Sequence, residues 1–317
     1  MKQALFLLNM GGPNNLDEVK LFLYNMFSDR NIIPNPFIRP LVRTIIIKKR
    51  LNEAKETYEE LGGKSPLYTL TTKLIDKLST KIEMPIYPVM RYVPPFAKEA
   101  LLECKKRGVE EILLFPLYPQ YSTTTTLSSY EDVLKACDII GYHPKISFVK
   151  ERYYDEPAYI EASAEKIIEA LEDREAEEYD LLLSAHGLPV SIIEAGDPYQ
   201  KEVEANVDAL RRYFEKRNIH FKNIKLVYQS KVGPQQWLEP SLVDTLRSPR
   251  NRKVLVYPLA FTVDNSETLF ELDIEAREIA EKIKYEAFIV AECMNSSDSF
   301  VNFIVQSLEK YHADTVE

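Results

Sequence analysis

Short apolar runs alternate with helix-like patterns along the whole chain. In the first half, these runs occupy residues 4–10, 86–92, 111–118 and 146–149. In the second half, they occupy residues 179–185, 224–230, 253–260 and 287–292. Stretches with helical spacing lie between them, for example 65–83 and 94–107. Strands that alternate with helices predict an α/β protein in which helices cover both faces of a parallel sheet.

The second half of the chain repeats the order of the first. Pro116 in "ILLFPLY" and Pro258 in "VLVYPLA" lie 142 residues apart, each near the end of an apolar run. Glu151 and Glu292 lie 141 residues apart, each where a strand ends and a helix begins. Two nearly equal offsets predict two similar α/β halves.

The chain has 317 residues, of which 45% are hydrophobic and 28% charged, as expected for a globular protein of two domains. The charged stretch "ALEDREAEEYD" indicates the junction between them. We expect an N-terminal domain over residues 1–150, a junction at about 150–175 and a C-terminal domain over residues 175–317.

Composition excludes several classes of protein. A net charge of −9 and a pI near 5.3 argue against a nucleic-acid partner. The three cysteines, Cys104, Cys137 and Cys293, form no CxxC pair, so we expect no disulfide framework, no iron–sulfur cluster and a reducing compartment. The opening "MKQALFLLNMGGP" has too short an apolar run for a signal peptide, which indicates a first strand and a cytoplasmic protein.

His186 is one of only four histidines, and it follows the apolar run "LLLSA" at the point where the strand ends. Ligands of open parallel sheets bind outside the carboxyl ends of the strands. Gly187 allows a close approach of the backbone, and apolar neighbours would keep the imidazole neutral. A neutral imidazole can accept a proton or bind a metal. The alternative is a structural histidine.

Glu267 follows another predicted strand, at the start of a predicted helix that Asn265 or Ser266 could cap. The spacing puts four carboxylates on one face of that helix: Glu267, Glu271, Glu275 and Glu278. Such a row suits a hydrated divalent cation and predicts a metal path, although Glu275 and Glu278 also fit a solvated face. His186 and Glu267 together are suited to moving protons and handing over a metal.

Residues 30–50, which we call the lip segment, carry six basic residues and no acidic one. Isoleucine, leucine, phenylalanine and proline lie between these charges. One interpretation is an amphipathic helix under the core. The other is a mobile apolar lip with exposed Ile45, Ile46 and Ile47, suited to a large flat hydrophobic anion or to a membrane surface.

These motifs together resemble the ferrochelatase family, which inserts ferrous iron into a porphyrin at the end of heme synthesis. The likeness covers nearly the whole chain in order. It rests on "LLNMGGP", "GGKSPL", "MRYVPP", "LYPQYSTTTT", "SAHGLP", "GDPY", "QSKVGPQQWL" and "FTVDNSETLFELDIE". The resemblance implies two Rossmann-like domains with a porphyrin cleft between them, each a parallel sheet flanked by helices.

The resemblance also implies roles for individual residues. His186 and Glu267 match the family's metal-binding and proton-handling residues. The remaining matches lie around the family's porphyrin pocket: Met10, Arg91, Tyr121, Ser122, Thr123 and Trp237. The propionates of the porphyrin would meet basic residues of the lip segment, for which Arg30, Arg39 and Arg43 are candidates. Asn265 stands where the family often has a second histidine, which puts in doubt any mechanism that needs two histidines.

We therefore expect an enzyme that takes ferrous iron and a porphyrin, protoporphyrin IX, as substrates and holds no permanent cofactor. We also expect a cytoplasmic monomer with peripheral contact to the inner face of the membrane. Two alternatives stay open. One is a chelatase for a related tetrapyrrole or another divalent metal. The other is a carrier that binds heme or porphyrin without catalysis.

Overall fold

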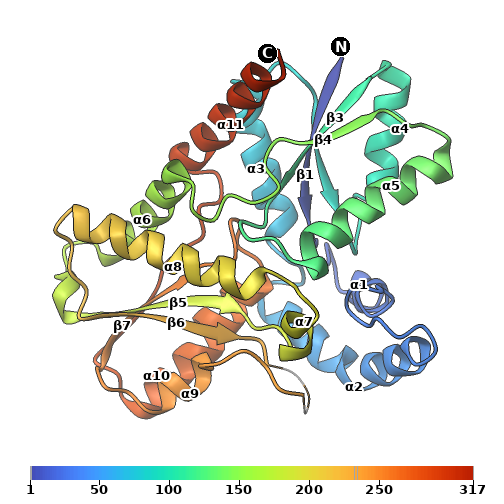
Figure 1. Ribbon diagram of the computed structural model, residues 1–317. Helices are drawn as coiled ribbons and strands as arrows, with labels where there is room; N and C mark the ends of the chain where they lie inside the picture. Colours follow the sequence, from blue (N-terminus) through green and yellow to red (C-terminus); the bar gives the residue numbers. More distant parts are fainter. Residues whose placement is uncertain (1, 232, 234, 317) are drawn as a thin grey trace. The chain divides into compact units, whose positions relative to one another are not determined.

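The computed structural model describes residues 2–231, 233 and 235–316. The chain divides into two compact units. The first contains Met1–Arg152 and Ile304–Glu317, and the second contains Tyr153–Phe303. Each unit is built on one four-stranded parallel sheet (Figure 1). We describe each unit separately.

The sheet of the first unit has the strand order β2-β1-β3-β4. Its strands are β1 (Gln3–Asn9), β2 (Ile86–Met90), β3 (Glu111–Pro116) and β4 (Lys145–Phe148). The helical elements are α1 (Glu18–Met26), α2 (Arg39–Glu60), α3 (Leu67–Ser79), α4 (Ala97–Arg107), the π-helix η1 (Thr123–Leu127) and α5 (Ser128–Ile140). The four strands lie where the apolar runs predict them.

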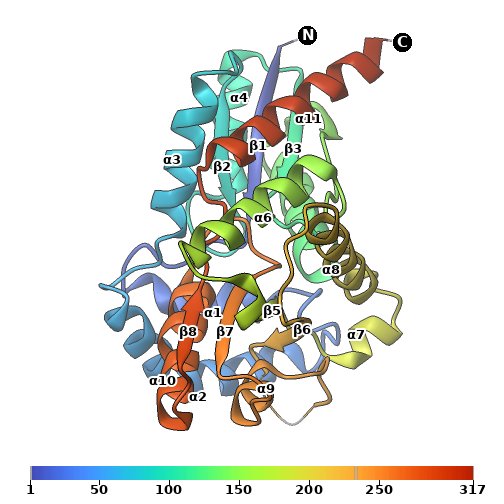
Figure 2. The same ribbon diagram turned by 90° about the vertical axis from the view of Figure 1, so that its left-hand side faces the viewer.

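Strand alternation organises the core of the first unit. Phe6 and Leu8 of β1 and Leu114 of β3 point to one face, where they join Leu101 of α4 and Val133 of α5 in one buried cluster. Helix α3 and the C-terminal part of α11 (Asp298–Val316) cover the other face (Figures 1 and 2). Both faces of the sheet are therefore covered, as a parallel sheet requires.

The sheet of the second unit has the order β6-β5-β7-β8, which is the order of the first sheet with every strand number raised by four. Its strands are β5 (Asp180–His186), β6 (Asn223–Gln229), β7 (Lys253–Pro258) and β8 (Ala287–Val290). Pro116 and Pro258 end β3 and β7, which occupy equivalent places in the two sheets. The predicted similarity of the two halves is confirmed.

The helices of the second unit lie on both faces of its sheet. They are α6 (Pro157–Leu171), the 3-10 turn η2 (Ala176–Glu178), α7 (Val190–Glu194), α8 (Tyr199–Lys216), α9 (Leu242–Arg247), the π-helix η3 (Glu267–Glu275), α10 (Ala276–Ile283) and the start of α11. Leu182, Val227 and Val256 of the sheet pack against Leu246 of α9 and Leu272 of η3. Helices α6 and α8 cover the opposite face (Figure 1).

The end of α11 belongs to the first unit, whereas we expected all of residues 175–317 in one domain. The Tyr311 hydroxyl donates a hydrogen bond to Glu111 over 2.9 Å, and Nε2 of His312 lies 3.0 Å from Oε1 of Gln3. These polar contacts tie the last turns of α11 to the amino-terminal edge of the first sheet. Sequence periodicity could not predict them, because they join residues about 200 and 300 positions apart.

The lip segment consists of turns followed by the first half of α2. Phe37 is 92% exposed and Ile45 is 46% exposed. Ile46 and Ile47 are half-buried, and Ile47 packs against the small cluster formed by α1 and α2. The segment is therefore not core, which agrees with the lip interpretation. Its mobility stays a prediction.

No helix in the described part of the chain combines the length and the apolar character needed to cross a membrane.

Candidate active site

His186 and Glu267 meet in the second unit. His186 is the last residue of β5, and strand alternation directs it to the same face as Leu182 and Ser184. The π-helix η3 covers that face and begins at Glu267. Nδ1 of His186 lies 2.7 Å from Oε2 of Glu267, which is hydrogen-bond distance. Their positions at one sheet edge predict this proximity.

A buried turn after β7 delivers Glu267. The Asp264 carboxylate is buried and accepts hydrogen bonds from Nδ2 of Asn295 over 2.6 Å and from the Thr268 hydroxyl over 2.8 Å. Oδ1 of Asn265 accepts a hydrogen bond from the Glu267 backbone N–H over 2.7 Å. Asn265 therefore acts as the expected cap and satisfies one free N–H of the helix start.

The helix that starts at Glu267 is a π-helix over nine residues, where the spacing of carboxylates suggested an ordinary α-helix. π-helical turns are rare and often occur at functional sites. The Glu271 carboxylate lies on the inner side of this helix. It accepts hydrogen bonds from Nε2 of Gln229 over 3.0 Å and from the Ser230 hydroxyl.

Gln229 ends β6 and is paired in register with His186 of β5. Its side chain is buried, and Nε2 also lies 3.4 Å from the Glu267 carbonyl oxygen. Its Oε1 accepts a hydrogen bond from the Ser184 hydroxyl over 2.8 Å. Gln229 thereby connects two strands to the π-helix. No sequence pattern above predicts a role for Gln229, although its place at a strand end was a usable signal.

Ser230 adopts a left-handed backbone conformation with φ of +66°. Such a conformation costs a residue with a side chain about 1–2 kcal/mol, and it is retained where surrounding structure imposes it. In Ser230 it accompanies the hydrogen bond from the hydroxyl to Glu271. The backbone strain therefore lies at a residue that contacts the carboxylate row.

Burial and neighbouring charge set the proton affinities of these groups. Burial raises the pKa of Glu271, and the charge of Glu267 raises it further, to about 7. Hydrogen bonds from Ser230 and Gln229 and the proximity of His186 act in the opposite direction. Glu271 therefore exchanges its proton near neutral pH, which an exposed glutamate does not do.

His186 differs from the expectation of a neutral imidazole. Burial lowers the pKa of His186, but the charge and hydrogen bond of Glu267 and the charge of Glu271 outweigh burial and raise it above 6.5. The adjacent carboxylates thus favour the protonated ring. The apolar run before His186 in the sequence does not reveal this, because both carboxylates come from a distant segment.

The four carboxylates of the predicted row divide into two pairs. Glu267 and Glu271 contact the residues at the sheet edge, whereas Glu275 and Glu278 are exposed. Glu278 accepts a hydrogen bond from Lys282 over 3.1 Å, which fits a solvated face. Within the described ranges, no group of three His, Cys, Asp or Glu side chains is arranged to hold a metal ion.

Gly187 follows His186 in the chain, and the Trp237 ring packs beside Gly187. A Cβ atom added to Gly187 would lie 2.8 Å from the Gln229 carbonyl oxygen and 3.5 Å from the Trp237 ring. The expected close approach at Gly187 is therefore present. Trp237 is buried and forms an isolated β-bridge with Pro189.

Four of the other predicted residues follow β1 and β3 of the first unit. Met10 is half-buried directly after β1. The Arg152 guanidinium lies over the Tyr121 ring, with its central carbon 4.8 Å from the ring centre. Ser122 is buried and its side chain accepts a hydrogen bond from the Thr124 N–H over 3.1 Å, which starts η1 at Thr123. These residues share the carboxyl-terminal edge of the first sheet.

Arg91, expected near the porphyrin, and the three lip arginines expected to meet propionates all have partners in the first unit. Arg91 contacts Asp29 and Asp132 at 3.2 and 3.3 Å. The partners of the lip arginines are Glu131 for Arg30, the Ile33 and Pro34 carbonyls for Arg39, and Ser28 and Tyr24 for Arg43.

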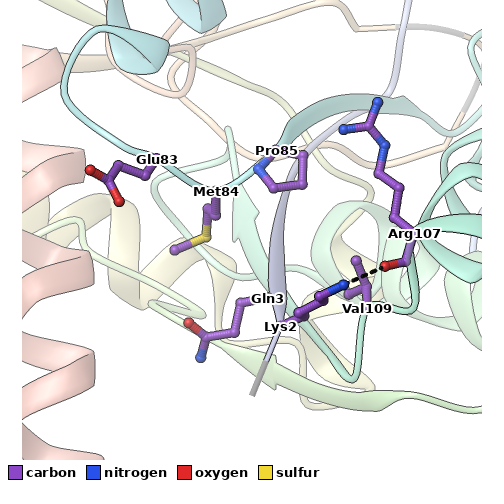
Figure 3. A pocket seen from close by; sticks show the side chains of 7 residues that line it. All are labelled: Lys2, Gln3, Glu83, Met84, Pro85, Arg107 and Val109. Carbon is purple, nitrogen blue, oxygen red and sulfur yellow. Dashed lines mark hydrogen bonds between the residues drawn. The ribbon is translucent and has the colours of Figure 1, made fainter.

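A shallow pocket of about 500 Å³ lies at the opposite edge of the first sheet. It is lined by residues that precede β1, β2 and β3, among them Lys2, Pro85 and Val109 (Figure 3). The Lys2 ammonium donates a hydrogen bond to the Arg107 carbonyl across it over 3.4 Å. Because it lies at the amino-terminal ends of the strands, this pocket is separate from the loops that carry the predicted ligand residues.

The fold places the protein in a structural class. Its two parallel sheets of equal topology are similar to those of solved chelatases. SirB from Bacillus subtilis, solved with Fe3+, matches with a TM-score of 0.60 and 12% identity over 99% of this chain and 97% of that one. CbiX, an enzyme of siroheme biosynthesis in denitrifying bacteria, matches with a TM-score of 0.54 and 13% identity, covering 98% of this chain and 99% of that one. At these identities the likeness concerns the fold alone.

The family model described as Ferrochelatase matches residues 2–311, and the chain belongs to this family. The Ferrochelatase of Wolinella succinogenes is 48% identical over 98% of this chain and 99% of that protein. The Ferrochelatase of Helicobacter pylori strain G27 is 43% identical over 99% of this chain and 94% of that protein. The predicted family, fold class and enzymatic function, metal insertion into a porphyrin for heme synthesis, are confirmed.

Proposed function

We propose that the protein inserts ferrous iron into protoporphyrin IX, with His186 as acceptor of a pyrrole proton and Glu267 as its partner on the side from which the metal arrives. The observation that carries this assignment is the 2.7 Å contact between Nδ1 of His186 and Oε2 of Glu267 at the carboxyl-terminal edge of a parallel sheet. Iron and porphyrin are both substrates, and neither is a resident group of the protein.

The chemistry requires a base and a carboxylate close together. A free-base porphyrin carries two pyrrole N–H protons, and both leave when Fe²⁺ binds the four ring nitrogens, so the product is neutral in its centre. The neutral form of His186 accepts one proton at a time. Glu271, with a pKa of about 7, is suited to receive protons from this pair and release them to solvent. Glu267 offers the hard oxygen ligand that Fe²⁺ meets before insertion.

Binding of the porphyrin ring is assigned to the apolar and hydroxyl side chains at the carboxyl-terminal sheet edges. In the first unit these are Met10, Tyr121, Ser122 and Thr123. In the second unit, Trp237 packs beside Gly187, the residue that follows His186. This position supports a contact between Trp237 and the porphyrin ring. Glu275 and Glu278 are assigned to an outer, solvated part of the metal path because they are exposed on the same helical segment.

We further propose that no iron–sulfur cluster belongs to the protein. Cys104 and Cys137 lie in the first unit and Cys293 in the second, and all three are buried as free thiols. A cluster needs several thiolate ligands at one place. Stoichiometric iron and labile sulfide in the purified protein would contradict this proposal.

The lip segment is proposed as a peripheral contact with the inner face of the membrane, made by a cytoplasmic monomer. The exposed apolar side chains of this region support it: Leu21, Tyr24, Phe37, Ile38, Leu41 and Ile45. Apolar side chains beside lysine and arginine are typical of surfaces that bind anionic lipid. Co-sedimentation with anionic vesicles, compared between the native protein and Phe37→Ser, tests this contact.

The decisive experiment is anaerobic incubation of the purified protein with Fe²⁺ and protoporphyrin IX, followed by the absorbance change on metal insertion. Parallel reactions with coproporphyrin, with other tetrapyrroles and with Co²⁺ or Zn²⁺ measure specificity. Turnover of another tetrapyrrole or metal in preference to iron and protoporphyrin would support the related chelatase instead. Stoichiometric porphyrin binding without turnover would identify a carrier and refute the proposal.

A further inference from the structure

We infer that Arg91 is a positioning residue that acts through the buried carboxylate of Asp29, and that it does not bind a carboxylate of the porphyrin. This inference rests on the proposed function, because it concerns the loops assigned to the porphyrin. The resemblance places Arg91 only around the porphyrin pocket, and the inference states what the residue does there. All residues concerned lie in the first unit.

Asp29 is a buried carboxylate with an unusual number of donors. Asp29 as a whole is only 4% exposed. It accepts hydrogen bonds from the Tyr92 hydroxyl over 2.9 Å, from the Asn31 backbone N–H over 2.8 Å and from the Ser128 hydroxyl. Arg91 adds a charge-assisted bond from Nη2 over 3.2 Å. A buried carboxylate needs such compensation, because an unpaired buried charge is costly.

Arg91 is bound on three sides. Its Nε donates to the Ser128 hydroxyl over 2.9 Å, its Nη1 to Asp132 over 3.3 Å and its Nη2 to Asp29. The guanidinium has five N–H groups in a fixed planar fork. Each of its three nitrogen atoms donates one of these bonds. A substrate carboxylate would therefore have to share this guanidinium with two carboxylates of the protein.

Charge leads to the same conclusion. Asp29 and Asp132 both contact the single positive charge of Arg91. The nearby Glu131 is engaged separately by Arg30 and by the Asn31 amide. With two carboxylates already on one guanidinium, a third carboxylate from a propionate would add repulsion in a partly buried place.

The network connects the loops that follow three strands with the start of the lip segment. The backbone N–H groups of Arg91 and Tyr92, after β2, donate to the carbonyls of Asn9 and Met10 at the end of β1. Ser128 directly follows η1 and the hydroxyl-rich loop after β3. Asp29 itself precedes the lip segment. One buried carboxylate thus holds in place the segments that carry Met10, Tyr121, Ser122 and Thr123.

The test compares porphyrins with and without charged propionates. Insertion would be measured for Arg91→Met, Asp29→Asn and the double variant, with protoporphyrin IX and with its dimethyl ester in the same detergent. We expect each single variant to raise the KM for both porphyrins by a similar factor, about tenfold, and to change kcat less. We expect the double variant to resemble the singles, because residues in one network are strongly non-additive.

Two results would overturn the inference: an Arg91→Met effect confined to the free acid, or effects of Arg91→Met and Asp29→Asn that multiply. Arg107→Met is the matched control, since Arg107 is an exposed, ion-paired arginine of the same unit outside the network. It should leave both KM values unchanged.

A structural readout keeps the inference testable if insertion is absent. Limited trypsin digestion should cleave the lip segment at Lys48 and Lys49 faster in Asp29→Asn and Arg91→Met than in the native protein. Unchanged cleavage in both variants would overturn the inference. If Arg91→Met does not fold, Arg91→Lys retains the charge and should show the same pattern in weaker form. Failure of the native protein to insert iron would refute the proposed function and leave this readout valid.

Discussion

His186 and Gln229 occupy the same register position on the neighbouring parallel strands β5 and β6, and each contacts a different glutamate of the π-helix η3. His186 meets Glu267 and Gln229 meets Glu271. Two adjacent strand ends are thus matched to two carboxylates four residues apart. The register of the second sheet therefore determines the spacing of the groups assigned to proton and metal transfer.

Replacing His186 by alanine should abolish iron insertion while leaving folding and porphyrin binding largely intact. The residue sits at a strand end with a side chain about one-third exposed, so it contributes little to packing. A positioned acid–base group contributes about 10²–10⁴-fold, and the rate should fall by at least this factor. Absorbance assays of insertion, circular dichroism and porphyrin fluorescence titration check the three parts. Insertion at close to the normal rate would refute the mechanism.

Glu267→Gln should have nearly the same effect on insertion, because it keeps the shape of the side chain and removes the charge that faces His186. The matched control is Glu281→Gln, which removes an exposed carboxylate of helix α10 outside the predicted metal path. We expect the control to retain most of the activity. Equal losses in the two variants would indicate that the effect is one of overall charge.

Ser230 offers a way to separate backbone strain from the hydrogen bond to Glu271. Both Ser230→Ala and Ser230→Gly remove the hydroxyl, and both should raise the KM for Fe²⁺ to a similar extent. Glycine tolerates a φ of +66°, whereas alanine does not, so the glycine variant should be more stable by about 1 kcal/mol. Urea unfolding and metal titration of insertion measure the two effects. A glycine variant with normal iron dependence would show that the hydroxyl has no role.

Glu111 should make the first unit sensitive to acid. Burial raises the pKa of Glu111, but hydrogen bonds from Lys145, Gln3, Tyr311 and Ser147 outweigh it and lower the pKa to about 2. A lowered pKa stabilises the folded state above the unfolded value of about 4.5, and this stabilisation is lost as the pH falls from there to about 2. The contribution is at most about 3 kcal/mol.

The corresponding experiment measures the free energy of unfolding of native protein and Glu111→Gln between pH 7 and pH 3. Below pH 5, the free energy of unfolding of the native protein should fall more steeply than that of Glu111→Gln. The difference in unfolding free energy between the two proteins should therefore narrow as the pH falls. Glu177→Gln, a change at an exposed glutamate, is the control and should follow the native curve. A constant difference across this range would contradict the prediction.

Much of the fold could be predicted from local pattern. All eight strands lie at the apolar runs, because buried parallel strands need continuous apolar residues whatever the rest of the chain does. The offset between Pro116 and Pro258 nearly equals the offset between Glu151 and Glu292, and this predicted two similar α/β halves. The proximity of His186 and Glu267 followed from one general property, the shared edge at which parallel strands end.

Other features depended on contacts between distant segments. The π-helical form of η3 and the roles of Gln229 and Ser230 arise where β6 lies beside β5, which no local pattern specifies. The raised pKa of His186 has the same origin, since its neighbours in sequence are apolar and its neighbours in space are acidic. The segment from Ile304 onward joined the first unit through Tyr311 and His312 for a similar reason.

The sequence by itself determined which residues form strands, which edge of each sheet carries the candidate site residues and which family the motifs resemble. It did so because burial and chain direction leave periodic and positional marks in the sequence. Only the tertiary structure decided that Arg91 is held by Asp29 and Asp132 and that the half-buried Glu271 contacts Ser230. Hydrogen bonds and charge pairs of this kind form between residues brought together by folding, and their energies depend on distances and burial that the order of residues does not contain.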